Sequence, residues 1–188
     1  MSGQIADVYK YKNKSYHIID SNPYTVFDPR EYGLKPDTDC YSACWRGYYS
    51  KFSIVEKRLF LNKLYIETED GKYPPVAEVQ VKFPNEVDYF TVFSVYEDLS
   101  LFVPHTGKML VGDEFLQEYY IHMGHQRIWA YQDVKEFVFK DGFLTEVNDL
   151  SSLAKKLRDE SVNKSDLTFC KYRDMEAMKP YLNEWWCK

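Results

Sequence analysis

The chain has no surplus of positive charge and no long apolar run, and both shortages exclude classes of protein. Lys and Arg together number 24 against 29 Asp and Glu, which leaves a formal net charge of −5. A nucleic-acid-binding protein needs a basic stripe to neutralise phosphates, and this balance offers none. No stretch approaches the roughly 18 consecutive apolar residues that a membrane-spanning helix needs. We therefore expect a protein that binds neither nucleic acid nor a membrane.

Export signals are also lacking. The first residues, "MSGQIADVYKYK", contain no apolar core of signal-peptide length, so we expect a cytoplasmic protein. The cytoplasm keeps thiols reduced, and the few cysteines are then expected to be free. They are Cys40, Cys44, Cys170 and Cys187.

No motif of an established catalytic class is present. The segment "HTGKMLVG" contains a Gly-Lys pair but lacks the spaced glycines and the following Ser or Thr of a phosphate-binding loop. The G-x-S-x-G turn of serine hydrolases is absent. The acidic residues are spread along the chain as on an ordinary solvated surface. The sequence therefore predicts no catalytic residue and no cofactor.

What the sequence does have is an excess of aromatic residues, 18% of the total, with 17 Tyr and 12 Phe. Tyrosine is favoured in strands and on half-buried surfaces, and it is also common at protein interfaces. Strands explain most of these residues, and an interface could explain a few.

Apolar and polar residues alternate along several segments that turn residues separate, which predicts antiparallel hairpins. The clearest is 133–149, where an Asp-Gly pair supplies the positive φ of a tight turn. Within 58–68 the alternation slips, and a β-bulge near Asn62 and Lys63 would restore the register. A further strand is expected at 76–83. The other hairpins are expected at 8–19 and 45–68.

Helical spacing appears later in the chain. Apolar residues recur at three-to-four spacing from Phe115 to Met123, which predicts a short amphipathic helix over residues 113–123. A surface helix is expected at 150–161, and the tail beyond it is expected to be helical. We predict a single α+β domain over residues 1–188, dominated by antiparallel β-hairpins, with a short mid-chain helix and C-terminal helices.

Several motifs occur in a recognisable order: "ACWRGYYSKFSIVEKRLFLNKLYIE" (43–67), "HTGKMLVGDEF", "YIHMG" and "FVFKDGFLTEV". In this order they resemble a widespread family of bacterial proteins with a WRGY hairpin and a Y-x-HMG segment, without an assigned activity. The resemblance covers about residues 5–150 and leaves 151–188 as a C-terminal helical tail. It implies a bacterial, cytosolic protein with one domain. His125 and Cys40 depart from the family pattern, which counts against a metal site built on them.

The cysteines and histidines could form two kinds of reactive site, but a structural role explains these residues more simply. Cys40, Cys44, His122 and His125 have the ligand types of a zinc site, but not the tight spacings. Cys44 and His122 could pair as thiolate and base. A cysteine beside Trp45 is, however, more typical of a buried and inert thiol. We therefore predict no metal site.

The best candidates for binding are aromatic residues next to arginine, the types enriched at interface hot spots. Arg46 and Tyr48 share one face of an expected strand, so the arginine can lie over the tyrosine ring. Arg127 and Trp129 share a face in the same way if their segment is extended. The candidate binding residues are Trp45, Arg46, Tyr48, His122, Arg127 and Trp129.

Three functions stay open, and we favour the first. It is a non-enzymatic binding protein whose partner is a more basic protein, such as the toxin domain that an immunity protein neutralises. This analogy rests on the acidic charge, the aromatic excess and the missing catalytic constellation. The second is an enzyme of unrecognised type with a pocket around His122, Arg46 and His105. The third is a structural or regulatory subunit without a ligand of its own.

Overall fold

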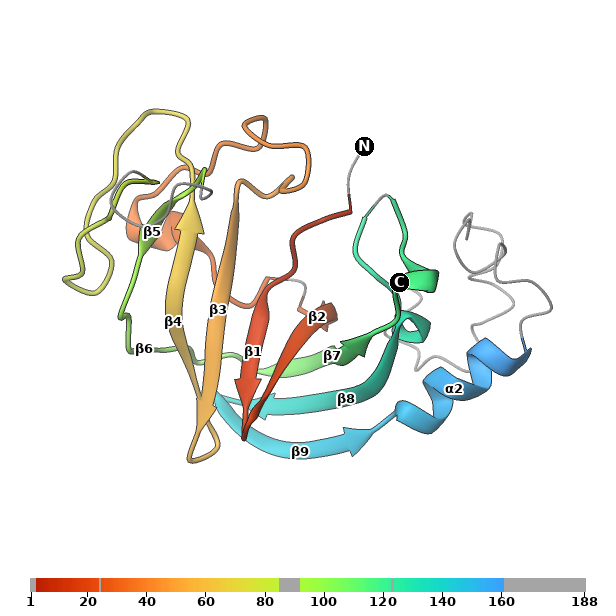
Figure 1. Cartoon of the computed structure of the whole chain (residues 1–188). Coiled ribbons are helices and arrows are strands. Elements are labelled where there is room, and N and C mark those ends of the chain that lie inside the picture. Colours follow the sequence, from red (N-terminus) through yellow and green to blue (C-terminus); the bar gives the residue numbers. More distant parts are fainter. Residues whose placement is uncertain (1–2, 24, 85–91, 123, 161–188) are drawn as a thin grey trace.

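The strands of this computed structural model form one sheet that curls round and closes on itself (Figure 1). The structure describes residues 3–23, 25–84, 92–122 and 124–160. The strands are β1 (Val8–Tyr11), β2 (Lys14–Asn22), β3 (Tyr48–Val55), β4 (Arg58–Ile66), β5 (Ser94–Tyr96), β6 (Leu101–Phe102), β7 (Gly107–Phe115), β8 (Tyr131–Lys140) and β9 (Phe143–Asp149).

Seven of these strands complete a barrel. They pair in the order β3, β1, β2, β7, β8, β9 and β4, and β4 pairs with β3 again. β1 and β3 run parallel, with Val8 beside Lys51, whereas the other pairs are antiparallel. β9 and β4 meet at a single register pair, Arg58 and Phe143. β5 and β6 pair with β4 outside the closed circuit.

Tight turns form the hairpins where the sequence predicts them. Glu56 and Lys57, between β3 and β4, have φ values of 47° and 64°. Asp141 and Gly142, between β8 and β9, have φ values of 50° and 81°. These left-handed conformations match the twist of adjoining strands, so the two hairpins are confirmed. The hairpin expected at 8–19 is also confirmed, as β1 and β2.

The predicted bulge in the second strand of the β3–β4 hairpin is confirmed as well. Lys51 pairs with Lys63, and the next residue, Phe52, pairs with Leu61. Asn62 is therefore the extra residue on β4. It returns the leucines on either side of the bulge to the inner face of the barrel.

Apolar side chains fill the barrel. Tyr9 on β1 is fully buried and stacks on Phe52 of β3, with 4.7 Å between ring centroids. Because side chains occupy the interior, the ends and outer face of the barrel are where a ligand or partner can bind. The buried residues of this core include Tyr9, Tyr48, Phe52, Leu59, Leu61, Leu64, Ile66, Met109, Val111, Phe137 and Phe139.

Short helices pack outside the barrel. They are the 3₁₀ helices η1 (Pro29–Tyr32), η2 (Gln117–Tyr119) and η3 (Ile128–Ala130), and the α-helix α2 (Ser151–Glu160). α2 follows β9 and lies beside β8 (Figure 1). It buries Ala154 and Leu157 in a second apolar cluster with Trp129. The surface helix expected at 150–161 is therefore confirmed.

The predicted mid-chain helix over 113–123 is wrong. β7 continues to Phe115, and only η2 follows it. Met109 and Val111 face the barrel interior and Leu110 faces the outer cluster, so both faces of this strand are apolar. A strand buried on both faces has no alternation that would mark it in the sequence.

The strand expected at 76–83 is also wrong. Ala77 and Glu78 have φ values of 47° and 68°, which places a tight turn in the middle of the segment. Val76 and Val79 form an isolated bridge across this turn. The alternation of "VAEVQVKF" therefore reflects a turn with one buried valine rather than a strand.

The structure thus supports a domain rich in β-strand, which is coarser than the predicted α+β class with C-terminal helices. Within the described residues, α2 is the α-helix of the domain. The tail after Asp159 and Glu160 lies outside the described residues, so its predicted helices are not tested. Over the part of the chain described, no helix has the length and apolarity needed to cross a bilayer.

Candidate functional site

A buried ion pair lies at the end of the barrel where β1 and β3 begin. Arg46 Nη2 and Nη1 donate to Asp7 Oδ1 and Oδ2 at 2.9 and 3.1 Å. The backbone N–H of Ser50 donates to Asp7 Oδ1 at 2.7 Å. Asp7 is 4% exposed, so its charge is compensated by these bonds rather than by solvent. The pair joins the first strand to the segment that enters β3.

The guanidinium of Arg46 also lies over the ring of Tyr48, 4.9 Å from its centroid. The predicted arginine–tyrosine stack is therefore confirmed, although Tyr48 itself is buried and its hydroxyl donates to the carbonyl of Phe27 at 3.1 Å. Tyr48 is thus a core residue. Arg46 is held by the ion pair and the ring together, so it positions the chain around it.

His125 lines a small cavity beside this ion pair. The cavity has a volume of about 20 Å³, and its other lining residues include Asp7, Asp20 and Arg46. Burial, followed by the charge of Arg46, lowers the pKa of His125 below its usual value. Within the part of the chain that the structure describes, the buried Nδ1 of His125 has no hydrogen-bond partner. A volume of this size accommodates about one water molecule, which is too small for a substrate.

Two large aromatic side chains stand out from the loop between η1 and β3. Tyr41 is 43% exposed and Trp45 is 48% exposed. The ring of Tyr41 meets Phe93 edge-on at 5.9 Å, which links it to a third apolar cluster that includes the buried Cys44. The ring of Tyr41 is therefore exposed on one side and packed against this cluster on the other.

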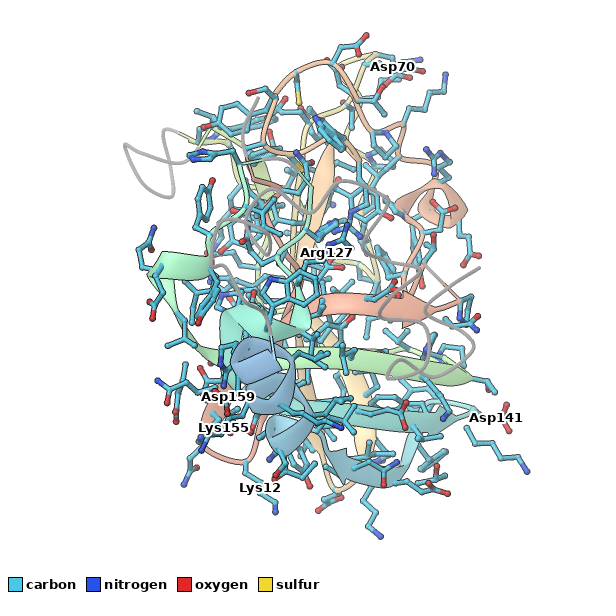
Figure 2. All side chains as sticks on the ribbon, turned by 90° about the vertical axis from the view of Figure 1, so that its right-hand side faces the viewer. Lys12, Asp70, Arg127, Asp141, Lys155 and Asp159 are labelled. Carbon is cyan, nitrogen blue, oxygen red and sulfur yellow. The ribbon has the colours of Figure 1, made fainter. Side chains whose placement is uncertain are left out.

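Acidic side chains lie on the same loop and on the segment that follows β4. Asp37 and Asp39 lie on the same loop, and Glu67, Glu69 and Asp70 follow β4. The two segments are joined, because the N–H of Asp37 donates to the carbonyl of Glu67 at 2.8 Å. Figure 2 shows Asp70 at the top of the molecule. Five carboxylates thus meet two lysines, Lys35 and Lys72, at this end of the barrel.

Backbone hydrogen bonds fix the loop itself. The N–H of Cys44 donates to the carbonyl of Tyr41, and that of Gly47 donates to the carbonyl of Cys44, both at 2.9 Å. Gly47 has φ of 73°, and a Cβ there would lie 2.4 Å from the carbonyl oxygen of Asp37. Only glycine fits this contact, which brings the acidic start of the loop against its aromatic end.

The remaining candidate binding residues do not join this surface. Trp129 is 2% exposed and belongs to the core beneath α2. Arg127 is exposed and precedes η3, so the predicted shared face with Trp129 is wrong, because the segment is helical rather than extended. His122 is exposed and meets the ring of Tyr120 at 5.1 Å. It does not hold the end of the predicted helix, because only η2 precedes it and η2 ends at Tyr119.

The pocket expected around His122, Arg46 and His105 is not formed. Arg46 lines the small cavity with His125, whereas His105 lines a different cleft and His122 is at the surface. His125 is therefore the histidine that approaches Arg46. The two histidines three residues apart lie in different surroundings, as expected from the glycine between them.

The cysteines described by the structure are free thiols, as expected. Cys44 is 2% exposed, its thiol donates to the carbonyl of Tyr48 at 3.3 Å, and burial raises its pKa to about 11. This is the buried, inert thiol that the sequence suggested. Cys40 is exposed and its thiol donates to the carbonyl of Asp37 at 3.2 Å. Cys170 and Cys187 lie outside the described residues.

One carboxylate group has the spacing of a cation site within the described chain, namely Asp113, Glu114 and Asp133. The ammonium of Lys14 already lies among them, 2.7 Å from Asp133 and 3.1 Å from Glu114. The cluster is therefore a salt-bridge network centred on a lysine, which occupies the place that a metal ion would take.

Sequence reasoning missed Asp7 and His125 as members of a polar cluster. Asp7 is a single acid before a strand, and its partner Arg46 lies 39 residues later. A separation of this length gives no local pattern. The parallel pairing of β1 with β3, which brings them together, has no signature in the sequence of either strand.

Comparison of the chain with protein-family models, with curated proteins and with solved structures returns no match in any of the three. The family resemblance of the WRGY and Y-x-HMG motifs therefore stays a prediction. The function has to be argued from the surface and the clusters of the chain itself.

Proposed function

We propose that the protein is a non-enzymatic binding protein that docks a more basic protein through the surface formed by Tyr41 and Trp45 and the carboxylates around them. A toxin domain neutralised by occlusion is the kind of partner that this surface suits. The observation that carries the proposal is that two half-exposed aromatic rings and two carboxylates lie on one loop, which backbone hydrogen bonds fix and join to the acidic segment after β4.

The aromatic rings supply the binding energy. Tyrosine and tryptophan are enriched among interface residues whose truncation costs the most, and they are most effective near the centre of a contact. Trp45 and Tyr41 expose roughly half of their surface, and Trp45 lies in a turn closed by its neighbours. Burial of these rings under a partner removes apolar area from water.

The carboxylates supply steering and orientation. The charges of Asp37, Glu67 and Asp39 all reach the thiol of Cys40, whose pKa is raised by burial and then by these charges. They therefore act on one region of the surface. An acidic region of this kind raises the association rate of a basic partner and repels an acidic one.

The ion pair of Arg46 and Asp7 has a positioning role in this proposal. Arg46 is next to Trp45 and is bound to the segment before β1. The N–H of Trp45 donates to the side chain of Gln4 at 2.8 Å, which adds a second tie to the same segment. A loop fixed before binding loses little further entropy when a partner docks.

The test is capture of partners from the native host by the full chain, followed by identification and affinity measurement with the purified partner. We expect a basic protein whose affinity falls at least tenfold with Trp45→Ala, because a central aromatic contributes about 2 kcal/mol. Phe143→Ala is the matched control, since Phe143 is also 48% exposed but lies on β9.

A second pair of variants tests the steering. Asp39→Asn combined with Glu69→Gln should lower the association rate and its dependence on salt, whereas Glu146→Gln on β9 should change neither. The proposal fails if no protein is captured, or if the captured protein loses as much affinity with Phe143→Ala as with Trp45→Ala.

A further inference from the structure

We propose that a separate cleft, between η1 and the segment that joins β6 to β7, binds a small organic cation, an ammonium group carried on an apolar body. η1 and β6 lie on the left of the barrel in Figure 1. The cleft has a volume of about 400 Å³, within the range of small-molecule sites. The site goes beyond the docking surface and does not depend on it.

Aromatic rings line the cleft. Phe27 and Tyr32 stack on each other with 5.4 Å between centroids, and Phe102, which is 37% exposed, lines the cleft from β6. The face of an aromatic ring carries a negative potential, so rings of this kind attract a cation that has been stripped of water. The apolar side chains Val26 and Leu101 complete an environment for a methylated or alkyl body.

The charged side chains that line the cleft are acidic. Asp28 and Glu31 line the cleft, and no Lys or Arg is found among those of its lining residues that the structure describes. Arg30 lies 3.4 Å from Asp28 and partly neutralises it. Glu31 is exposed and has no ion pair within the described chain, so it is the carboxylate that is ready to face a ligand cation.

His105 provides a hydrogen-bonding group in the same cleft. It is 5% exposed, and its Nε2 is buried with no hydrogen-bond partner among the described residues. Burial lowers the pKa of His105 to about 4, so the ring is neutral at pH 7 and does not repel a cation. A buried polar atom without a partner is costly, and a ligand hydroxyl or N–H, or a water, would satisfy the imidazole.

The two walls of the cleft are held together by close backbone contacts. A Cβ on Gly107 would lie 2.0 Å from the carbonyl oxygen of Asn22, so the ends of β2 and the start of β7 touch. The N–H of Gly142 donates to the carbonyl of His105 at 2.8 Å, which ties the second wall to the β8–β9 turn. The cleft is therefore largely preformed, as small-molecule sites usually are.

The test is an NMR titration of the full chain with choline and with 3,3-dimethyl-1-butanol, which has the same shape without the charge. We expect choline to shift the amide signals of Thr25, Glu31 and Thr106, with a millimolar dissociation constant. The neutral isostere should bind about tenfold more weakly. Glu31→Gln should weaken choline several-fold and leave the isostere unchanged, and Glu146→Gln is the control for a remote charge.

Three results would overturn the proposal. The first is no shift of these amides at about 50 mM choline, well above the expected dissociation constant. The second is equal binding of choline and its isostere, which would reduce the cleft to an apolar groove. The third is a response to a trilysine peptide without a response to choline, which would assign the cleft to a protein side chain. None of these outcomes bears on the Trp45 test, so the two proposals fail separately.

Discussion

The two ends of β1 carry charge clusters that differ in exposure. Before its first residue, Asp7 pairs with Arg46, and their side chains are 6% and 22% exposed. Past its last residue, Lys14 lies among three carboxylates with 44% of its side chain exposed. Figure 2 marks the second end by Lys12, at the bottom of the molecule, far from Asp70 at the top.

The difference shows what each cluster does for the fold. A buried charge without its partner is an uncompensated cost of several kcal/mol, so the Asp7 pair dictates where the β3 entry can lie. An exposed cluster exchanges its partners for water and salt at little cost, so the Lys14 network adjusts to the turn beside it. The buried pair therefore fixes the position of the chain at one end of β1, whereas the exposed cluster at the other end follows the position that the chain already has.

The largest effect is expected from breaking the buried pair. Arg46→Met leaves Asp7 buried with only the N–H of Ser50 to satisfy it, so we expect a loss of about 3–5 kcal/mol in the free energy of unfolding. Urea denaturation followed by fluorescence measures this loss. Because Trp45 adjoins the pair, the loop surface should also lose affinity for its partner.

Two further variants serve as controls for the Arg46→Met measurement. Arg58→Met removes an exposed pair with Glu56, whose side chains are 44% and 76% exposed, and should cost no more than about 1 kcal/mol. Arg46→Met combined with Asp7→Leu should recover part of the stability, since no buried charge is left. An Arg46→Met loss as small as that of Arg58→Met would contradict the contrast between the two ends.

A buried titratable group without a charged partner gives the intermediate case. The pKa of His105 is lowered to about 4 from an unfolded value of 6.5, so the unfolded chain binds the extra proton between these values. Stability from this group is therefore complete above pH 6.5 and falls as the pH drops toward 4. Because one pKa unit corresponds to about 1.4 kcal/mol, we expect a loss of at most about 3 kcal/mol.

Denaturation at a series of pH values checks this window. His105→Phe should flatten the curve between pH 6.5 and about 4. The buried His125, whose pKa is also lowered, adds to the same slope and should remain in the variant. A curve that His105→Phe leaves unchanged would show that this ring binds protons equally in the folded and unfolded states, so that its pKa is not lowered by folding.

The smallest effect is expected at the exposed cluster. Lys14→Met removes the common partner of Glu114 and Asp133, and the loss of stability should shrink as salt is added, because exposed charges are screened. Burial works to raise the pKa of Asp133, but its hydrogen bonds from Lys135, Lys14 and Tyr16 outweigh burial and hold the pKa below 3.8.

The lowered pKa of Asp133 determines how the stability contributed by this cluster changes at low pH. A carboxylate with a lowered pKa contributes stability above its unfolded value and loses it as the pH falls through the folded value. The wild type and Lys14→Met should therefore converge at the acid end, below about pH 3. A difference between them that persists in high salt and in acid would mean that the cluster is structural after all.

Much of the strand pattern could be predicted, because it is local. The turn at Glu56 and Lys57, the bulge at Asn62 and the hairpin around Asp141 all follow from residues within a few positions of each other. The prediction of a helix at 113–123 was wrong because the aromatic residues with helical spacing lie on two different elements, the end of β7 and η2, which follow each other in the chain. Closure of the barrel depends on distant pairings and left no local signal.

The same division applies to the candidate site. The contact of Arg46 with the ring of Tyr48 was predicted from strand alternation, but Arg46 lies in the turn before β3, so the contact forms without the shared strand face that was expected. Trp45 was singled out by residue type as a candidate binding residue, and it is 48% exposed. The acid at position 7 and the meeting of Asp37 with Gly47 depend on contacts across the barrel end, which composition and spacing do not encode.

The closed circuit of strands also determines the order in which a newly synthesised chain can pair its strands. β2 pairs with β1 at once, but its second neighbour is available only when β7 has been synthesised, and β4 can pair with β9 only after the hairpin that begins at Tyr131 has been made. Until then the early hairpins present open edges, which are templates for pairing with other chains. The interval between the synthesis of the first hairpin and the last is thus the period in which this protein most needs protection from its own copies.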